Sequence, residues 1–279
     1  MELLERAFDM SKKLFDLPLE DKLKAPHPKI MTPHRGYSGV RDLETIKSLK
    51  RISDYKESYE IGSDENREHY NIWLPEQVLP GFRDFTTQLY WKLSDVATAI
   101  LEALILSVGF SEEEAKYVRK LHNGHTNQLR LLHYPTMPHD FPQYEDQSRL
   151  GAHTDWESFT FLFQDSHQGL EFLDRETGEF VAATPKPDTL YMNIGEMFMR
   201  LSNGYYPAGI HRVVIPASYR SSRYSIPFFV SPDPDAVIVP QPSCVAAGQK
   251  RRYEPITYRG FLNAQFKRIH VQKNPNRSQ

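Results

Sequence analysis

Two histidines and one aspartate form the strongest candidate for a chemical site. His153 and Asp155 are separated by one residue, so their side chains point to the same side if they lie on a strand or at its end. His211 follows later, inside an apolar segment with a strand-like pattern. Two imidazoles and one carboxylate from neighbouring strands form the facial triad that binds non-haem Fe(II) and leaves metal positions open. Zinc hydrolases use the same ligand types, so the triad alone does not choose the metal.

A basic and a hydroxyl side chain follow on the next predicted strand. Arg223 and Ser225 lie two residues apart and therefore share one face of that strand. A guanidinium fork beside a hydroxyl suits the distal carboxylate of a small dicarboxylic acid. This pair favours iron with a dicarboxylic co-substrate over zinc hydrolysis, for which no motif supplies a general base beside the triad. An ordinary ion-paired strand arginine is the alternative for Arg223.

The elements that must position these residues begin with a helical first part. Apolar residues recur every three or four positions from 82 to 108, which predicts a long amphipathic helix. Gly109 suits its C-terminal cap, and Ser111 with Glu114 predicts a capping box for the helix that follows. A shorter apolar stripe predicts a first helix over residues 3–15.

Beyond residue 125 the chain consists of short apolar or alternating runs separated by Gly, Pro, Asp and Asn. This spacing predicts an antiparallel sandwich or barrel. No linker or repeat divides the chain, so both parts are expected to form one unit. Strands are expected at 128–134, 158–164, 170–173, 189–194, 210–215, 224–230 and 236–239, with a further short strand at 55–61. The last helix is expected at 258–266, before a polar tail predicted to be disordered.

Composition excludes several classes of protein. The 279 residues carry a formal net charge of −2, which argues against an electrostatic grip on nucleic acid or anionic membrane. No apolar run approaches the roughly 20 residues needed to span a bilayer. Cys244 is the only cysteine, so no intrachain disulfide can form and a reducing, cytoplasmic location is expected. The expected partner is a small-molecule substrate.

The residues around the candidate site occur in the order of a known set of motifs. They occupy 129–135, 151–155, 162–165, 169–170, 193–195, 202–204, 211–213 and 223–229, with 35–37 and 56–59 upstream. In these stretches the chain resembles the 2-oxoglutarate/Fe(II)-dependent dioxygenases of the isopenicillin N synthase-like family. Residues 123–127 and 156–160 look most like fungal members, among them thymine 7-hydroxylase-like and secondary-metabolite enzymes.

The resemblance implies a fold that is mainly β with flanking helices. The expected architecture is a distorted double-stranded β-helix, or jelly roll, buttressed by the long helix at 82–108. Three parts are expected: a helical N-terminal part at 1–124, the dioxygenase core at 125–235, and a C-terminal strand, helix and polar tail at 236–279.

The resemblance also implies the cofactors and the residues that hold them. The implied Fe(II) ligands are His153, Asp155 and His211. The implied contacts to the co-substrate 2-oxoglutarate are Arg223, Ser225 and Tyr134. With O2, such a centre oxidises a C–H bond of a small organic molecule, by hydroxylation or desaturation for example, and releases succinate and CO2. No catalytic side chain is expected beyond the metal centre, and a buried core tyrosine is the alternative for Tyr134.

Several alternatives stay open at this point. Glu157 either lines the substrate pocket or faces solvent. The remaining histidines considered are expected to face solvent or lie in turns rather than bind metal: His122, His125, His133 and His167. The chain begins later than is usual in the family, which predicts an exposed N-terminal side and possible self-association through it. Two rival functions are an Fe(II) oxidase of the same family that does not use 2-oxoglutarate, and a non-catalytic truncated binding protein.

Overall fold

A computed structural model describes residues 2–28, 34–40, 55–136, 148–214 and 221–273. The helices are α1 (Glu2–Phe15), α2 (Leu19–Lys22), α4 (Phe82–Val108), α5 (Glu112–Lys120), α6 (Glu196–Leu201) and α7 (Tyr258–Lys273), with a 3-10 turn η1 (Pro242–Cys244). The strands are β1 (Gly36–Ser38), β2 (Glu57–Ile61), β3 (Gln128–Tyr134), β4 (Ser148–His153), β5 (Phe159–Gln164), β6 (Leu170–Leu173), β7 (Phe180–Ala182), β8 (Tyr191–Ile194), β9 (His211–Val214), β10 (Arg223–Val230), β11 (Val237–Ile238) and β12 (Ile256–Thr257).

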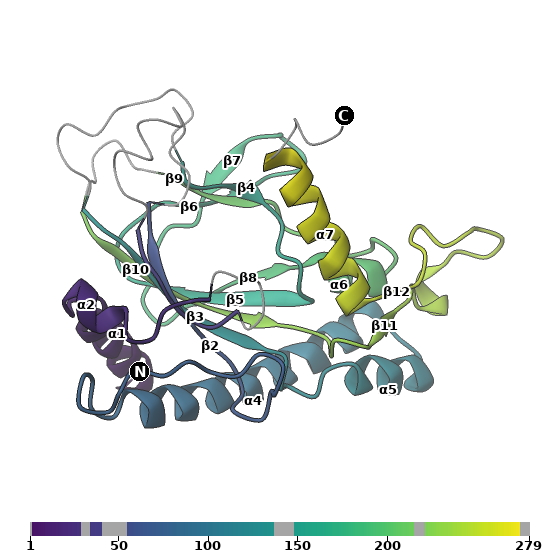
Figure 1. The fold of residues 1–279 in the computed structure, drawn as a ribbon. Coiled ribbons are helices and arrows are strands. Elements are labelled where there is room, and N and C mark those ends of the chain that lie inside the picture. The colour runs from purple at the N-terminus through teal and green to yellow at the C-terminus, as the bar shows by residue number, and fades with distance from the viewer. Residues whose placement is uncertain (1, 29–33, 41–54, 137–147, 215–220, 274–279) are drawn as a thin grey trace, which may run out of the picture.

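Two antiparallel sheets face each other, as expected for a jelly roll (Figure 1). The major sheet has six strands in the order β1-β2-β3-β10-β5-β8, and the minor sheet has four in the order β4-β9-β6-β7. Strands β11 and β12 form a separate pair. The predicted fold, mainly β with flanking helices, is confirmed. The first part of the chain is not only helical, because it also contributes two strands to the major sheet. Strand β1 pairs with β2, and β2 pairs with β3.

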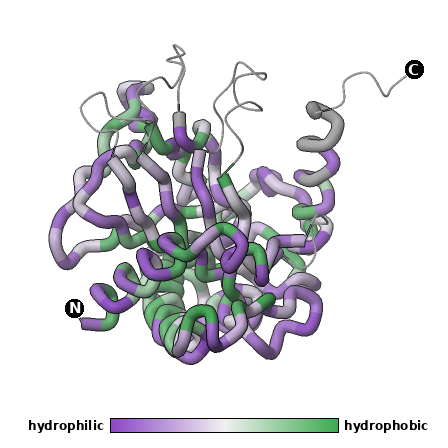
Figure 2. The backbone as a smooth tube through the Cα atoms, turned by 60° about the vertical axis from the view of Figure 1, so that its left-hand side comes forward, coloured by the Kyte–Doolittle hydropathy of each residue, from purple (hydrophilic) through white to green (hydrophobic). Residues whose placement is uncertain are grey.

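Helix α4 covers the outer face of the major sheet (Figure 1). It spans the predicted residues, and Gly109 ends it in a left-handed conformation, with φ of 76°. The capping box of Ser111 and Glu114 opens α5 as predicted. The tube coloured by hydropathy is most hydrophobic along α4 and the strands above it (Figure 2). The long helix therefore buttresses the sheet through an apolar interface.

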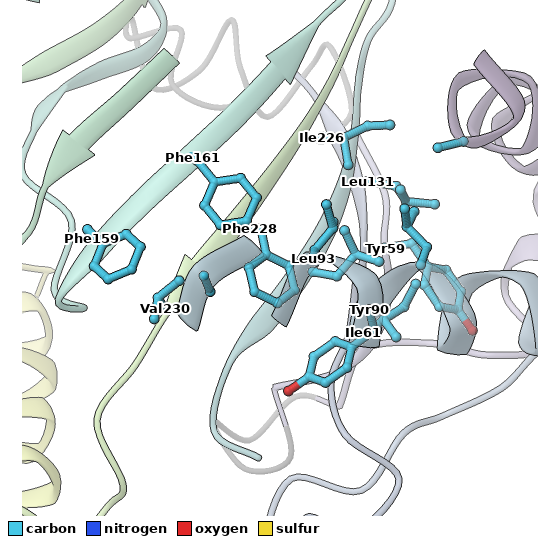
Figure 3. Close-up of a cluster of buried hydrophobic side chains, with 14 of the residues drawn as sticks. Tyr59, Ile61, Tyr90, Leu93, Leu131, Phe159, Phe161, Ile226, Phe228 and Val230 are labelled. Carbon is cyan, nitrogen blue, oxygen red and sulfur yellow. The ribbon is translucent and has the colours of Figure 1, made fainter. Parts of the chain in front are cut away.

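The main hydrophobic core lies between α4 and the major sheet (Figure 3). Phe161 of β5 and Phe228 of β10 are fully buried there, with ring centroids 5.2 Å apart. Tyr90 of α4 packs against Phe228 at 5.5 Å. Because side chains alternate along a strand, the neighbours of Phe228 point the other way, toward the space between the two sheets. Packing on one face of β10 thus fixes what the opposite face presents.

A buried polar network ties the N-terminal helices to the major sheet. Glu57 accepts hydrogen bonds from Lys22 at 2.9 Å and from Tyr37 at 2.6 Å. Its second oxygen lies 2.7 Å from Nδ1 of His133, whose Nε2 lies 2.6 Å from the hydroxyl of Ser222. The expectation that His133 faces solvent or lies in a turn is wrong, because its ring lies on β3 with a largely buried side chain.

Two further expectations concern the rest of the chain. Strand β4 was not among the predicted strands, and its sequence Ser-Arg-Leu-Gly-Ala-His has little of the alternation that marks a strand. The polar tail that was predicted to be disordered ends at residues 274–279, which lie outside the described residues. Within the described part of the chain, no helix combines the length and apolar character needed to cross a membrane.

Candidate active site

The two candidate histidines are direct neighbours across a strand pair. Strands β4 and β9 run antiparallel in the minor sheet, and their register places His153 opposite His211. The two imidazole centroids lie 4.3 Å apart. Strand pairing, rather than closeness in sequence, brings these two residues to one point.

Both imidazoles are oriented by hydrogen bonds to backbone carbonyls. Nδ1 of His153 lies 2.8 Å from the carbonyl oxygen of Gly151, and Nδ1 of His211 lies 3.1 Å from that of Gly209. Since a carbonyl oxygen only accepts, each Nδ1 must carry the proton and donate it. Each Nε2 is then left with a free lone pair, the arrangement expected of a metal-ligating histidine.

Asp155 completes the cluster from the loop that follows β4. Its Oδ1 lies 3.8 Å from Nε2 of both histidines, and its Oδ2 accepts a hydrogen bond from Nδ2 of Asn193 at 2.8 Å. Burial favours the protonated acid, but the two histidines and Asn193 lower the pKa of Asp155 overall. Burial also lowers the pKa of His153, as does His211. A carboxylate and a neutral imidazole are the forms that bind metal.

The loop that carries Asp155 is held against helix α6 at very close range. The backbone N–H of Glu196 donates to the carbonyl of Asp155 at 2.9 Å, and that of Gly195 donates to Ser158 at 2.9 Å. A Cβ atom on Gly195 would lie 2.2 Å from the carbonyl oxygen of Glu157. Only glycine permits this approach without displacement of the backbone, so Gly195 helps to set the position of Asp155.

The ligand atoms of His153, Asp155 and His211 all lie within 4.8 Å of one another. Within the described ranges, this is the only group of three or more His, Cys, Asp or Glu side chains that could share a metal ion. Their donor set of two nitrogens and one oxygen is that of the facial triad of non-haem iron. The residues therefore fit an iron ion.

The second group of candidate residues lies on the major sheet, across the inter-sheet space. Arg223 of β10 is 1% exposed and pairs in register with Tyr134 of β3, whose ring centroid lies 5.1 Å from the guanidinium carbon. The guanidinium lies 3.0 Å from Oε1 of Gln164 and 3.4 Å from the hydroxyl of Ser225. It also donates to the carbonyl of His167 at 3.3 Å. Among the described residues no carboxylate pairs with Arg223, so this buried cation can receive an anion.

A single cavity of about 310 Å³ joins the two groups. All six predicted site residues line it: Tyr134, His153, Asp155, His211, Arg223 and Ser225. Most of the remaining wall is apolar, with Leu132, Leu150, Leu162, Leu170, Phe172, Val213, Pro227 and Phe229. The cavity thus combines a metal-binding triad, a buried cation and an apolar surface.

Three lining residues outside the predicted set also belong to the site. Asn193 lies in the motif at 193–195, but the sequence analysis does not predict its contact with Asp155. A polar residue inside an otherwise apolar strand could have indicated a role in the site. Glu157 lines the cavity, so of its two alternatives the pocket position is confirmed. Burial, and next the charge of Asp155, raise the pKa of Glu157 to about 7. Lys56, which directly precedes β2, lines the same cavity and was not singled out.

Comparisons with known proteins agree with this geometry. Residues 126–232 match the 2OG-Fe(II) oxygenase superfamily, and residues 1–78 match the N-terminal region described as "non-haem dioxygenase in morphine synthesis N-terminal". The chain is 31% identical to the 2-oxoglutarate-Fe(II) type oxidoreductase hxnY of Emericella nidulans, covering 95% of this chain and 77% of that protein. It is 34% identical to the proline hydroxylase buaE of Petromyces alliaceus, covering 88% and 78%.

Solved structures give the same result. The crystal structure of a full-length Neurospora crassa protein in complex with alpha-KG matches with a TM-score of 0.85 at 33% identity, over 96% of this chain and 83% of that one. A structure of the same Neurospora crassa protein with alpha-KG and thymine matches with a TM-score of 0.84 at 33% identity, over 96% and 84%.

Proposed function

The chain belongs to the 2OG-Fe(II) oxygenase superfamily, and from this premise we propose how its own residues divide the work of a 2-oxoglutarate-dependent dioxygenase. The protein oxidises a small organic molecule with Fe(II), 2-oxoglutarate and O2. We assign His153, Asp155 and His211 to iron, and Arg223, Ser225 and Tyr134 to 2-oxoglutarate. The observation that carries the assignment is that both groups line one cavity from opposite sheets.

The three residues of the triad would hold the metal, and neighbouring groups orient each of them. The carbonyls of Gly151 and Gly209 hold the two imidazoles so that both Nε2 atoms face Asp155, and Asn193 holds the carboxylate. The three residues line the cavity, so an ion held by them would be accessible from it. When bound, iron and 2-oxoglutarate together supply the oxidising power for C–H oxidation and release succinate and CO2. The protein contributes geometry and a largely apolar wall that limits access of water.

The buried guanidinium of Arg223 is proposed to receive the distal carboxylate of 2-oxoglutarate. Ser225 lies on the same face of β10, two residues away, and adds a hydroxyl donor. Gln164 and the carbonyl of His167 hold the guanidinium in place from behind. The ring of Tyr134 completes the wall of this subsite. Arg223 and the triad line the same cavity, and a dicarboxylate bound there would lie between them.

The test is the product formed from the co-substrate. Purified protein with Fe(II), 2-oxoglutarate and O2 is expected to release succinate, and the rate should rise when a substrate is present. His211→Ala is expected to abolish both Fe(II) binding and succinate release, since two remaining ligands do not fix the facial geometry. Oxidation of an added substrate without succinate would instead support the oxidase that does not use 2-oxoglutarate.

The finer assignment within the superfamily rests on similarity. The Neurospora crassa structure matched at a TM-score of 0.84 holds thymine, and a relative at 34% identity is a proline hydroxylase. We propose that the substrate is a small nitrogen-containing metabolite of one of these two kinds, nucleobase or amino acid. The fungal type, a role in secondary metabolism, the cytoplasmic location, the three-part division of the chain and the possible self-association remain predictions.

A further inference from the structure

Two oppositely charged side chains in the cavity have no role in holding iron or 2-oxoglutarate under the proposed function, on which this inference rests. Lys56 and Glu157 both line the 310 Å³ cavity that contains the triad. Neither has an oppositely charged side chain within 4.0 Å among the described residues. Arg130, the other charged residue of this wall, already has a partner, because its Nε lies 3.1 Å from Oε1 of the buried Glu60.

Both charges lie close to the metal triad but reach it from different elements. Lys56 directly precedes β2 in the major sheet and lines the cavity from that side. Glu157 comes from the loop that also carries Asp155, and both residues line the same cavity. A substrate placed over the open side of the metal would therefore meet a cation on one side and a carboxyl group on the other.

A second cavity extends the space beside Glu157. It has a volume of about 230 Å³ and shares Arg130, Trp156 and Glu157 with the first cavity. Glu157 thus lies at the boundary between the two, whereas Lys56 lines only the cavity of the triad. The two cavities therefore adjoin at the wall formed by these three residues.

The cofactors leave these two charges unbalanced. Arg223 would be neutralised by the distal carboxylate of 2-oxoglutarate, and Asp155 by iron. Lys56 and the carboxyl group of Glu157 would remain in this partly apolar cavity without a role toward either cofactor. Charged groups removed from water are stabilised only when they are paired or hydrogen-bonded. An uncharged nucleobase would bring no opposite charge to either group, whereas a ligand with one positive and one negative group would pair with both.

We propose that the substrate is a free amino acid, held as a zwitterion with its carboxylate on Lys56 and its ammonium group on Glu157. The aliphatic carbons between or beside these two groups would then lie over the open side of the metal. This makes Glu157 and Lys56 the residues that determine substrate class, and it selects the amino acid over the nucleobase.

The experiment measures binding without turnover. Protein loaded anaerobically with Fe(II) and 2-oxoglutarate is titrated in a calorimeter with L-proline, L-leucine, 5-aminopentanoate and thymine. The tightest amino acid is then compared with its methyl ester and its N-acetyl derivative. Each derivative removes one charge and is expected to bind at least about tenfold more weakly, the scale of a lost hydrogen bond to a charged group.

The variants assign each end of the ligand to one residue. Lys56→Gln is expected to remove the preference for the acid over the ester, and Glu157→Gln the preference for the free amine over the N-acetyl form. Lys92→Gln and Glu112→Gln are matched controls on α4 and α5, with side chains 63% and 84% exposed, and should keep both preferences. The ester and N-acetyl comparison on the unmodified protein tests the proposal even if a variant does not fold.

The outcomes separate this inference from the proposed function. Fe(II) and 2-oxoglutarate are titrated first, and failure of either to bind would refute the assignment of the cofactor residues. If both bind but no amino acid binds more tightly than thymine, only the zwitterion proposal is overturned. It is also overturned if Lys56→Gln weakens 2-oxoglutarate and leaves the acid-over-ester preference intact, because the cation would then belong to the co-substrate.

Discussion

Replacement of Arg223 by lysine tests the co-substrate site most directly, because it keeps the charge and removes the planar fork. The guanidinium contacts Gln164, Ser225 and the carbonyl of His167 from three of its nitrogens, and the residue is 1% exposed. A lysine ammonium concentrates its donors on one nitrogen and cannot keep these contacts while it also grips a carboxylate with two parallel bonds. Arg223→Lys should therefore weaken the binding of 2-oxoglutarate.

The expected size follows from the bonds lost. Loss of one hydrogen bond between charged groups costs about 1.5–3 kcal/mol, which corresponds to roughly 10- to 150-fold in the Kd for 2-oxoglutarate. Fe(II) affinity should stay near the unmodified value, because the metal ligands lie on β4, the loop after it, and β9, whereas Arg223 lies on β10 of the other sheet.

Anaerobic calorimetry measures both constants, with Fe(II) titrated first and 2-oxoglutarate second. Arg119→Lys is the matched control, since Arg119 makes two bonds to Glu102, at 2.7 and 2.9 Å, but its side chain is 40% exposed. An exposed pair contributes no more than about 1 kcal/mol to stability, and this control should leave both ligand affinities unchanged. Unchanged 2-oxoglutarate affinity in Arg223→Lys, or lost iron with retained co-substrate, would show that the roles assigned here are wrong.

Three further predictions concern the surroundings of the site. Asn193→Ala removes the hydrogen bond to Asp155 and should weaken Fe(II) binding about 10- to 100-fold in a metal titration, with 2-oxoglutarate turnover falling in parallel. Gly195→Ala places a Cβ 2.2 Å from the carbonyl oxygen of Glu157 and should lower the free energy of unfolding by roughly 1–3 kcal/mol in urea; an unchanged midpoint would contradict the close packing of this loop. Burial raises the pKa of Glu57, but hydrogen bonds from its three partners lower it overall from 4.5, so its contribution to stability is complete above about pH 4.5 and is lost as the pH falls through the lower folded value. The free energy of unfolding, measured in urea, should thus be about 3–5 kcal/mol higher for the unmodified protein than for Glu57→Gln at pH 7. This difference should shrink in acid, and a difference that is constant down to pH 3 would refute the role of this network.

The sequence alone determined the elements whose local signals are strong. Helix α4 could be predicted to the residue, because its apolar period, its C-terminal glycine and the capping box after it all act within a few positions. The types of His153, Asp155 and His211 also indicated their chemistry, since few ligand sets combine two imidazoles with one carboxylate, whereas Tyr134 was implied only by the resemblance. These properties depend on neighbours in the chain, and a sequence displays such neighbours directly.

The tertiary structure alone decided which residues meet. Strand β4 has weak strand character, and it forms because β9 pairs with it and places His211 opposite His153. The bond from Asn193 to Asp155 and the burial of His133 beside Glu57 join residues 38 and 76 positions apart. Contacts over such separations form only when whole sheets assemble, and side chains then take positions that no local propensity encodes. The placement of Lys56 and Glu157 in the wall of one cavity has the same origin, because two elements must pack before both side chains line it.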